Sequence, residues 1–209
     1  MIYNKAIASI IAANLLEIGA VKLSPSAPFT WASGKQSPIY CDNRMILSFP
    51  EVRNKVAEAF KEIILKEFAD VDIIAGVATG AIAHGVLVAA LLSKPFIYIR
   101  DKPKGHGRQN QIEGYYEKGK KVVVIEDLIS TGGSSLKAVR ACREEGLEVM
   151  SLLAIFSYQF KEAIENFKNE KCLYYTLSDF PFLLEMNRNS SKYTKQDISF
   201  MEEWYASNK

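Results

Sequence analysis

What this chain has little of excludes several classes of protein. Its 209 residues include only three cysteines, Cys41, Cys142 and Cys172, which are widely spaced and form no Cys-x-x-Cys pair. Such a set favours neither a disulfide framework nor a zinc site. No apolar run approaches the roughly 20 residues that a membrane-spanning helix needs. Because Asn14 and Glu17 interrupt the apolar N-terminal residues, we expect no signal peptide and a cytoplasmic protein.

An excess of charge of one sign is also missing. The chain carries 26 Lys and Arg residues against 24 Asp and Glu residues, a formal net charge of +2. This balance gives no reason to expect nucleic acid or a membrane surface as the main partner. No internal repeat, low-complexity tract or linker interrupts the chain, so its length fits one domain with a full core.

One stretch, residues 121–135, combines three features in a fixed order. Val122 to Ile125 is a run of β-branched residues, which predicts a strand buried on both faces of a parallel sheet. A Ser/Thr/Gly loop follows, and then a helical pattern at 136–145 that ends at Gly146. Backbone amides that converge in such a loop, at a helix N-terminus, bind anions. The stretch therefore predicts a monophosphate site.

Two adjacent carboxylates, Glu126 and Asp127, end the predicted strand. Each is costly to remove from water, and two side by side also repel each other. At the carboxyl end of a strand, where open α/β sheets bind ligands, sugar hydroxyls or a magnesium complex would explain them. The alternative is an ordinary strand–turn–helix connection with solvated acids, which the joint occurrence of strand, acids and loop disfavours.

Two further segments invite a functional interpretation. Residues 72–77 predict a second buried strand, followed by the loop 78–81 and a helix over 82–92; Gly76 and Gly80 allow close backbone approach, although a plain turn is the alternative. His84 on that helix is expected to be a packing or capping residue.

A short strand at 96–99 then leads into a basic segment with the cationic side chains Arg100, Lys102, Lys104, His106 and Arg108.

The basic segment, residues 100–114, contains three glycines and no apolar anchor before Ile112, so we expect it to be mobile. A solvated basic loop is the ordinary interpretation of such a pattern. A mobile cationic loop is also what a pyrophosphate leaving group requires, because it can close, neutralise developing charge and open again.

The segment 21–44 has three prolines and no sustained period, which predicts a small irregular or β-rich subdomain. Aromatic and cationic side chains alternate along it, a combination that suits a flat anionic heterocycle with a carboxylate. A surface hairpin with buried aromatic residues is an equal alternative. The alternating residues are Lys22, Phe29, Trp31, Lys35, Tyr40 and Arg44.

The remaining patterns predict structural elements. A helix over 3–18 ends at Gly19, and Ser48 with Glu51 predicts a capping box around Pro50 that opens another helix. The other expected elements are a strand at 149–155 and helices near 160–168, 179–186 and 194–206.

The stretch at 121–135 resembles the phosphoribosyl-diphosphate (PRPP) motif of the type I phosphoribosyltransferases. Lys22 and the runs PFTWASG at 28–34 and SPIYCDNR at 37–44 resemble the N-terminal hood of the orotate phosphoribosyltransferase family in particular. The resemblance implies transfer of the phosphoribosyl group of PRPP to orotate, giving orotidine 5′-monophosphate and pyrophosphate. It also implies Mg²⁺ bound mainly through the substrate, and a homodimer whose basic loop serves the partner's site.

The same resemblance implies an α/β fold, with a parallel sheet flanked by helices on both faces. One domain would span residues 1–209, with its core at about 48–160 and a small hood at about 18–47 that C-terminal elements complete. The loop 78–81 would be a second phosphate loop, for pyrophosphate, held by backbone contacts alone because Thr79-Gly80 stands where some members have a tyrosine–lysine pair.

The resemblance also assigns roles to single residues. Lys104, Glu126 and Asp127 would be catalytic, and Lys22 and Ser130 would contact orotate. Arg44 is a candidate for the orotate carboxylate on chemical grounds, because FSYQF at 156–160 lacks an arginine that some members carry there. The residues assigned to PRPP are Arg100, Lys104, His106, Glu126, Asp127, Leu128, Ile129, Ser130, Thr131, Gly132, Gly133 and Ser134.

Two alternatives remain. One is a phosphoribosyltransferase for a purine or uracil, which the hood motifs disfavour. The other is a non-catalytic PRPP-sensing regulator, but the chain has no recognition-helix pattern or broad basic face for nucleic acid. The Lys104/His106 loop also favours an enzyme.

A further departure from the family is Asp101, where some members have lysine; Lys102 is the nearest substitute.

Overall fold

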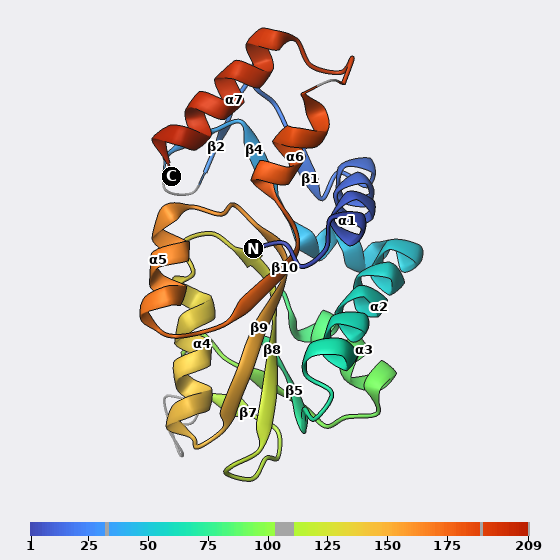
Figure 1. The fold of residues 1–209 in the computed structure, drawn as a ribbon, viewed down its shortest axis with the longest axis vertical. Helices are drawn as coiled ribbons and strands as arrows, with labels where there is room; N and C mark the ends of the chain where they lie inside the picture. The colour runs from blue at the N-terminus through green and yellow to red at the C-terminus, as the bar shows by residue number, and fades with distance from the viewer. Residues whose placement is uncertain (32–33, 103–110, 189, 209) are drawn as a thin grey trace.

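The computed structural model describes residues 1–31, 34–102, 111–188 and 190–208. Its centre is a six-stranded sheet in the order β10-β9-β8-β5-β6-β7, in which every pairing is parallel except that of β6 with β7 (Figure 1). The α/β fold with a parallel sheet is therefore confirmed. The strands are β5 (Ile73–Val77), β6 (Phe96–Ile99), β7 (Ile112–Glu113), β8 (Lys121–Ile129), β9 (Glu148–Ser157) and β10 (Tyr174–Asp179).

Helices cover both faces of this sheet, which explains the unbroken apolar run in β8. Val123 and Ile125 point into the core formed with α1, α2 and α3, whereas Val122 and Val124 point into the core formed with α4 and α5. Because side chains alternate along a strand, a strand covered on both sides must be apolar at every position. The helices are α1 (Lys5–Glu17), α2 (Pro50–Glu67), α3 (Ile82–Leu92), α4 (Gly133–Glu144) and α5 (Lys161–Asn169).

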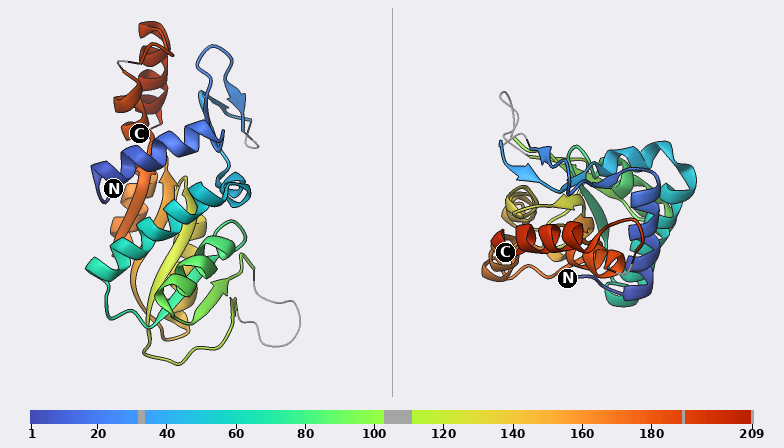
Figure 2. Two further views of the ribbon diagram at one scale, coloured as in Figure 1. Left: turned by 90° about the vertical axis from the view of Figure 1, so that its right-hand side faces the viewer. Right: turned by 90° about the horizontal axis from the view of Figure 1, so that it is seen from above.

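Short strands and the C-terminal helices lie together above the carboxyl edge of the sheet (Figure 2, left). β1 pairs with β4, and β2 pairs with β3, both antiparallel. The indole of Trp204 on α7 donates a hydrogen bond to the Gln36 main-chain oxygen at 2.8 Å, and its ring lies 5.9 Å from that of Trp31. These elements are β1 (Val21–Leu23), β2 (Phe29–Thr30), β3 (Gln36–Ser37), β4 (Ile39–Cys41), η1 (Asn43–Ser48), α6 (Phe180–Asn187) and α7 (Lys195–Ser207).

The expected helices are all present, but one predicted helix start is wrong. The N-cap of α2 is Phe49, without a side-chain cap, and Pro50 is its first residue. Ser48 cannot form the predicted capping box with Glu51, because it is still part of the 3-10 helix η1. Proline at the first position fixes the backbone and has no N–H that needs a partner. A capping box occurs instead at Thr194 and Asp197, where α7 begins.

In the part of the chain that the structure describes, no helix has the length and apolar character needed to cross a bilayer.

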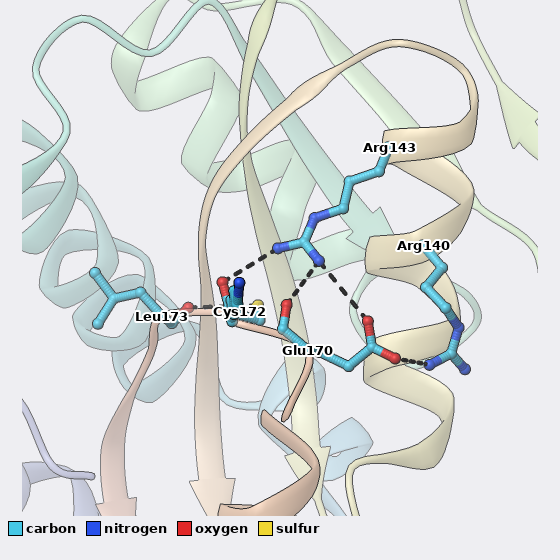
Figure 3. A network of polar contacts seen from close by, with 6 residues as sticks. Arg140, Arg143, Glu170, Cys172 and Leu173 are labelled. Carbon is cyan, nitrogen blue, oxygen red and sulfur yellow. Dashed lines mark hydrogen bonds and ion pairs between the residues drawn. The ribbon is translucent and has the colours of Figure 1, made fainter. Parts of the chain in front are cut away.

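A polar network fixes the C-terminal half of α4 to the turn that follows α5 (Figure 3). Arg143 donates hydrogen bonds to the main-chain oxygens of Glu170, at 2.8 Å, and Lys171, at 3.4 Å. Arg140 binds the Glu170 carboxylate at 2.6 Å. Carbonyls just beyond a helix end lack helical partners, so Arg143 satisfies oxygens that α5 leaves unpaired. The network therefore stabilises the far end of the helix whose N-terminus faces the predicted phosphate site.

We expect Arg143→Ala to lower the free energy of unfolding by about 1–3 kcal/mol, because it removes charged hydrogen bonds to main-chain oxygens. Arg140→Ala is the matched control: it removes only a half-exposed ion pair, worth about 0–1 kcal/mol. Urea unfolding of the two variants measures the difference. Equal losses would contradict the capping role of Arg143.

Candidate active site

Two loops meet at the carboxyl edge of the sheet, because β5 and β8 are adjacent and parallel, with Gly76 opposite Ile125. The loop after β5 is 78–81, and its Ala78–Thr79 peptide bond is cis. A Cβ atom added to Gly80 would lie 2.5 Å from the carboxyl carbon of Asp127. The backbone of this loop therefore touches the acid on β8, so the structure brings together two features that lie 47 residues apart in the sequence.

The two acids face opposite sides of β8, because the strand continues through them to Ile129. Glu126 is 4% exposed, and its Oε2 accepts a hydrogen bond from the Ser135 hydroxyl on α4 at 2.8 Å. Its Oε1 accepts one from the Asp127 main-chain N–H at 3.0 Å. Burial, and then the charge of Asp127, raise the pKa of Glu126 well above its usual range. Asp127 is half-buried and faces Gly80, so it is the acid of the pair that a ligand can reach.

The loop after β8 leads directly into α4. Gly132 is the N-cap of the helix, with φ +81°, and no side chain caps the first-turn amides. An added Cβ there would lie 2.9 Å from the Phe167 ring, so both the conformation and the space favour glycine. Thr131 and Ser134 are exposed, which leaves their hydroxyls available beside the uncapped amides. Such a helix start can bind a phosphate group.

The remaining residues assigned to PRPP in β8 contribute differently. Ile129 is buried and Leu128 is half-buried, and both side chains pack in the core. Only their main-chain groups could contact a ligand. Ser130, at the end of the strand, is half-buried.

The root of the basic segment lies beside both loops. The Arg100 N–H donates to the Gln111 main-chain oxygen at 2.8 Å, and the Lys137 ammonium on α4 contacts the carbonyl and carboxylate of Asp101. Arg100 also pairs with Glu113 at 3.4 Å. Lys104, His106 and Arg108 lie outside the described residues. An open pocket of about 470 Å³ is lined here by Ala78, Thr79, Ile82, Tyr98, Arg100, Asp101 and Lys102.

Two cationic side chains of the hood, Lys22 and Arg44, were predicted to bind the base, and they differ in whether they already have an ion-pair partner. Lys22 on β1 is exposed and lies opposite Tyr40 on β4, whose ring centroid is 5.7 Å from that of Phe29. Arg44 instead forms a two-pronged pair with Asp42, at 2.7 and 2.9 Å, and this pairing holds the pKa of Asp42 below its usual range. A ligand carboxylate would have to compete with Asp42 for Arg44. The geometry therefore favours Lys22 over Arg44.

Sequence patterns missed three residues of this site. Ser135 and Lys137 on α4 hold Glu126 and Asp101, and Asn43 donates its side-chain amide to the Asp127 main-chain oxygen at 2.6 Å. Asn43 could be noticed only as part of the SPIYCDNR run, because its partner lies 84 residues away. Within the described residues, no three His, Cys, Asp or Glu side chains are grouped so that they could hold a metal ion.

The phosphoribosyl transferase domain model matches residues 42–176, so the fold and the two loops define a phosphoribosyltransferase. The chain is 49% identical over 198 residues to the orotate phosphoribosyltransferase of Lactococcus lactis subsp. cremoris strain MG1363, covering 95% of each chain. It is 50% identical over 200 residues to that of Phocaeicola vulgatus, covering 96% of this chain and 94% of the relative. The chain belongs to the orotate phosphoribosyltransferase family.

A solved structure supports the same assignment. The crystal structure of orotate phosphoribosyltransferase from Aeropyrum pernix superposes with a TM-score of 0.75 at 30% sequence identity. The match covers 84% of this chain and 97% of that one.

We expect Gly80→Ala to lower kcat/KM by about 10²-fold, because its methyl group would displace the Asp127 carboxylate. The melting temperature should change little, since Gly80 does not require a left-handed backbone. If displacement of the acid is the cause, adding Gly80→Ala to Asp127→Asn should cost little more. Fully additive losses in this double-mutant cycle would contradict the argument.

Proposed function

We propose that this protein transfers the phosphoribosyl group of PRPP to orotate, giving orotidine 5′-monophosphate and pyrophosphate for de novo pyrimidine synthesis. One observation carries the proposal: the Asp127 carboxylate lies against the 78–81 loop, and five residues later Gly132 starts a helix whose first-turn amides no side chain caps. A ribose that carries a phosphate at one end and a pyrophosphate at the other fits this order of sites. Relatives that are orotate phosphoribosyltransferases, at 49–50% identity, support orotate as the base.

The arrangement supports catalysis by positioning and charge rather than by a strong protein base. Orotate can lose its N1 proton before attack, so the main barrier is the positive charge that develops at C1 of the ribose as pyrophosphate leaves. Asp127 binds the ribose hydroxyls and offsets that charge. The segment Ser130–Ser134 binds the 5′-phosphate through first-turn amides of α4 and nearby hydroxyls. Glu126 has a supporting role on the opposite face of β8, because its two oxygens already accept hydrogen bonds from the Asp127 N–H and the Ser135 hydroxyl.

The leaving group is proposed to lie between the 78–81 loop and Arg100, where the open pocket is. Lys104 and His106 would add positive charge from the basic segment. Mg²⁺ would arrive with the pyrophosphate oxygens. The donor set fits this role, because Asp127 offers one free carboxylate and Mg²⁺ usually takes one or two carboxylates together with substrate phosphates and water. When bound, the ion would neutralise the leaving group.

The hood is proposed to hold the base. Lys22 would bind the orotate carboxylate, the Phe29 and Tyr40 rings lie close by, and Ser130 would approach from the strand end. We infer one domain over residues 1–209, in which the hood at 18–47 is completed by α6 and α7; the Trp204 contacts support this division. A cytoplasmic location and the lack of a nucleic-acid or membrane partner stay predictions.

The substrate is tested by incubating the protein with PRPP, Mg²⁺ and one base at a time. We expect consumption of orotate with equimolar release of pyrophosphate. Hypoxanthine, adenine and uracil should be used at least about 10³-fold less efficiently, because a site built for a carboxylate leaves its cation unpaired with them. Preference for another base would contradict the proposal, and PRPP binding without turnover of any base would favour the regulator.

A homodimer is proposed with the basic segment acting in the partner's site. The helix α3, which starts at the 78–81 loop, has no polar side chain except His84, yet Val86 and Leu91 are 45% and 40% exposed. A helix of this kind is normally buried on all sides. A second copy of the chain packed on this face would bury it, and would place the partner beside the site.

Sharing of the site is tested by mixing two inactive variants, Lys104→Ala and Asp127→Asn, then dissociating and reassembling them. If the segment acts in trans, each mixed dimer has one site with both changes and one with neither. Random assembly makes about half of the dimers mixed, so about a quarter of the wild-type activity should return. No recovery, despite subunit exchange shown by mass spectrometry, would exclude a shared site without affecting the choice of base.

A further inference from the structure

Asn43 connects the hood to the ribose-binding acid. It lies in the hood, where it is the first residue of η1 after β4 and Asp42, and it is 1% exposed. Its Nδ2 donates to the main-chain oxygen of Asp127 at 2.6 Å. No other hydrogen bond between side chain and main chain joins the hood to β8 in the part of the chain that the structure describes.

The surroundings of Asn43 are unusually polar for a buried place. Its Oδ1 has no hydrogen-bond partner among the described residues, and neither ring nitrogen of His84 has one of good geometry. His84 is 1% exposed, on the first turn of α3, near the Asn43 main chain and the charge of Asp127. Burial lowers the pKa of His84, which favours the uncharged form of its ring. Buried polar atoms without partners lower stability.

An amide is therefore a poor choice if packing is the only task of residue 43, since an apolar side chain of equal size would avoid the unpaired oxygen. Sites where local rules are broken at a cost are often functional. The short hydrogen bond of the Asn43 amide is to the main chain of Asp127, the residue whose carboxylate contacts Gly80. Asp127 is thus restrained on two sides, by the backbone of the 78–81 loop and by the hood.

We propose that Asn43 is a positioning residue, which fixes the main chain of Asp127 and so sets the place of the ribose-binding carboxylate relative to the base held by the hood. The proposal rests on the proposed phosphoribosyl transfer. The two can fail separately, because turnover of orotate by the wild-type protein tests the reaction, and only the variants test Asn43.

The first experiment compares Asn43→Leu with a matched control, Asn187→Leu. Asn187 is also buried, at 7% exposure, and its Nδ2 donates to the Leu183 main-chain oxygen at 2.8 Å, but it lies in α6. Both variants lose a buried amide-to-carbonyl bond, so both should show a lower melting temperature. Only Asn43→Leu should lower kcat, by about tenfold or more, with the KM values for PRPP and orotate changed less than about threefold.

Equal kcat values for the two folded variants would overturn the proposal and leave Asn43 a structural residue. The proposal would also be overturned if Asn43→Leu raised only the KM for orotate and left kcat unchanged, because the amide would then serve base binding. Each kcat is referred to the concentration of active sites, so that partial unfolding does not count as loss.

The second experiment uses Asn43→Asp, which keeps the shape and can donate a hydrogen bond only when protonated. Burial and the neighbouring acids raise the pKa of the introduced carboxyl. The ratio of variant to wild-type kcat should therefore rise as the pH falls from 9 to 6. Taking the ratio removes titrations common to both proteins. The titratable groups nearest position 43 are Asp127 on β8, His84 on α3 and Cys41 on β4. A ratio that is low and independent of pH would overturn the proposal.

Discussion

The contact between the Gly80 backbone and the Asp127 carboxylate is the constraint on which the rest of the site depends. It exists because β5 and β8 are neighbours in a parallel sheet, so that both strands end at the same edge. The loops after these strands lead into α3 and α4, and both helices point their N-termini toward that edge. Two helix N-termini, each able to bind an anion, therefore lie on either side of Asp127. This arrangement suits a ribose with a phosphate on one carbon and a pyrophosphate on another.

Much of the fold could be predicted from sequence, since strands covered on both faces read as unbroken apolar runs. The strands β5, β6, β8 and β9 were found for this reason. The strand β10 was missed because its sequence, YYTLSD, buries Thr176 and Ser178 rather than aliphatic residues. β7 has only two residues and pairs antiparallel with β6, so it carries no periodic signal.

The site was predicted less completely than the fold, for geometric reasons. The predicted strand ended at Glu126 and Asp127, which made them look like one pair, whereas β8 continues to Ile129 and turns them to opposite faces. Arg44 looked available because no sequence pattern predicted the 3-10 helix η1, whose N-cap, Asp42, pairs with the Arg44 side chain. The contact of Asn43 with Asp127 joins distant segments, which local patterns cannot show.

The bond between Trp204 and Gln36 also has a consequence for the order in which the molecule is made. Synthesis proceeds from the N-terminus, and early segments fold as they emerge. The hood strands appear first, but part of their packing comes from an indole that is translated 168 residues later. On the ribosome, therefore, strands of the central sheet can pair before the short N-terminal strands reach their final packing, which is completed only after α7 has been synthesised.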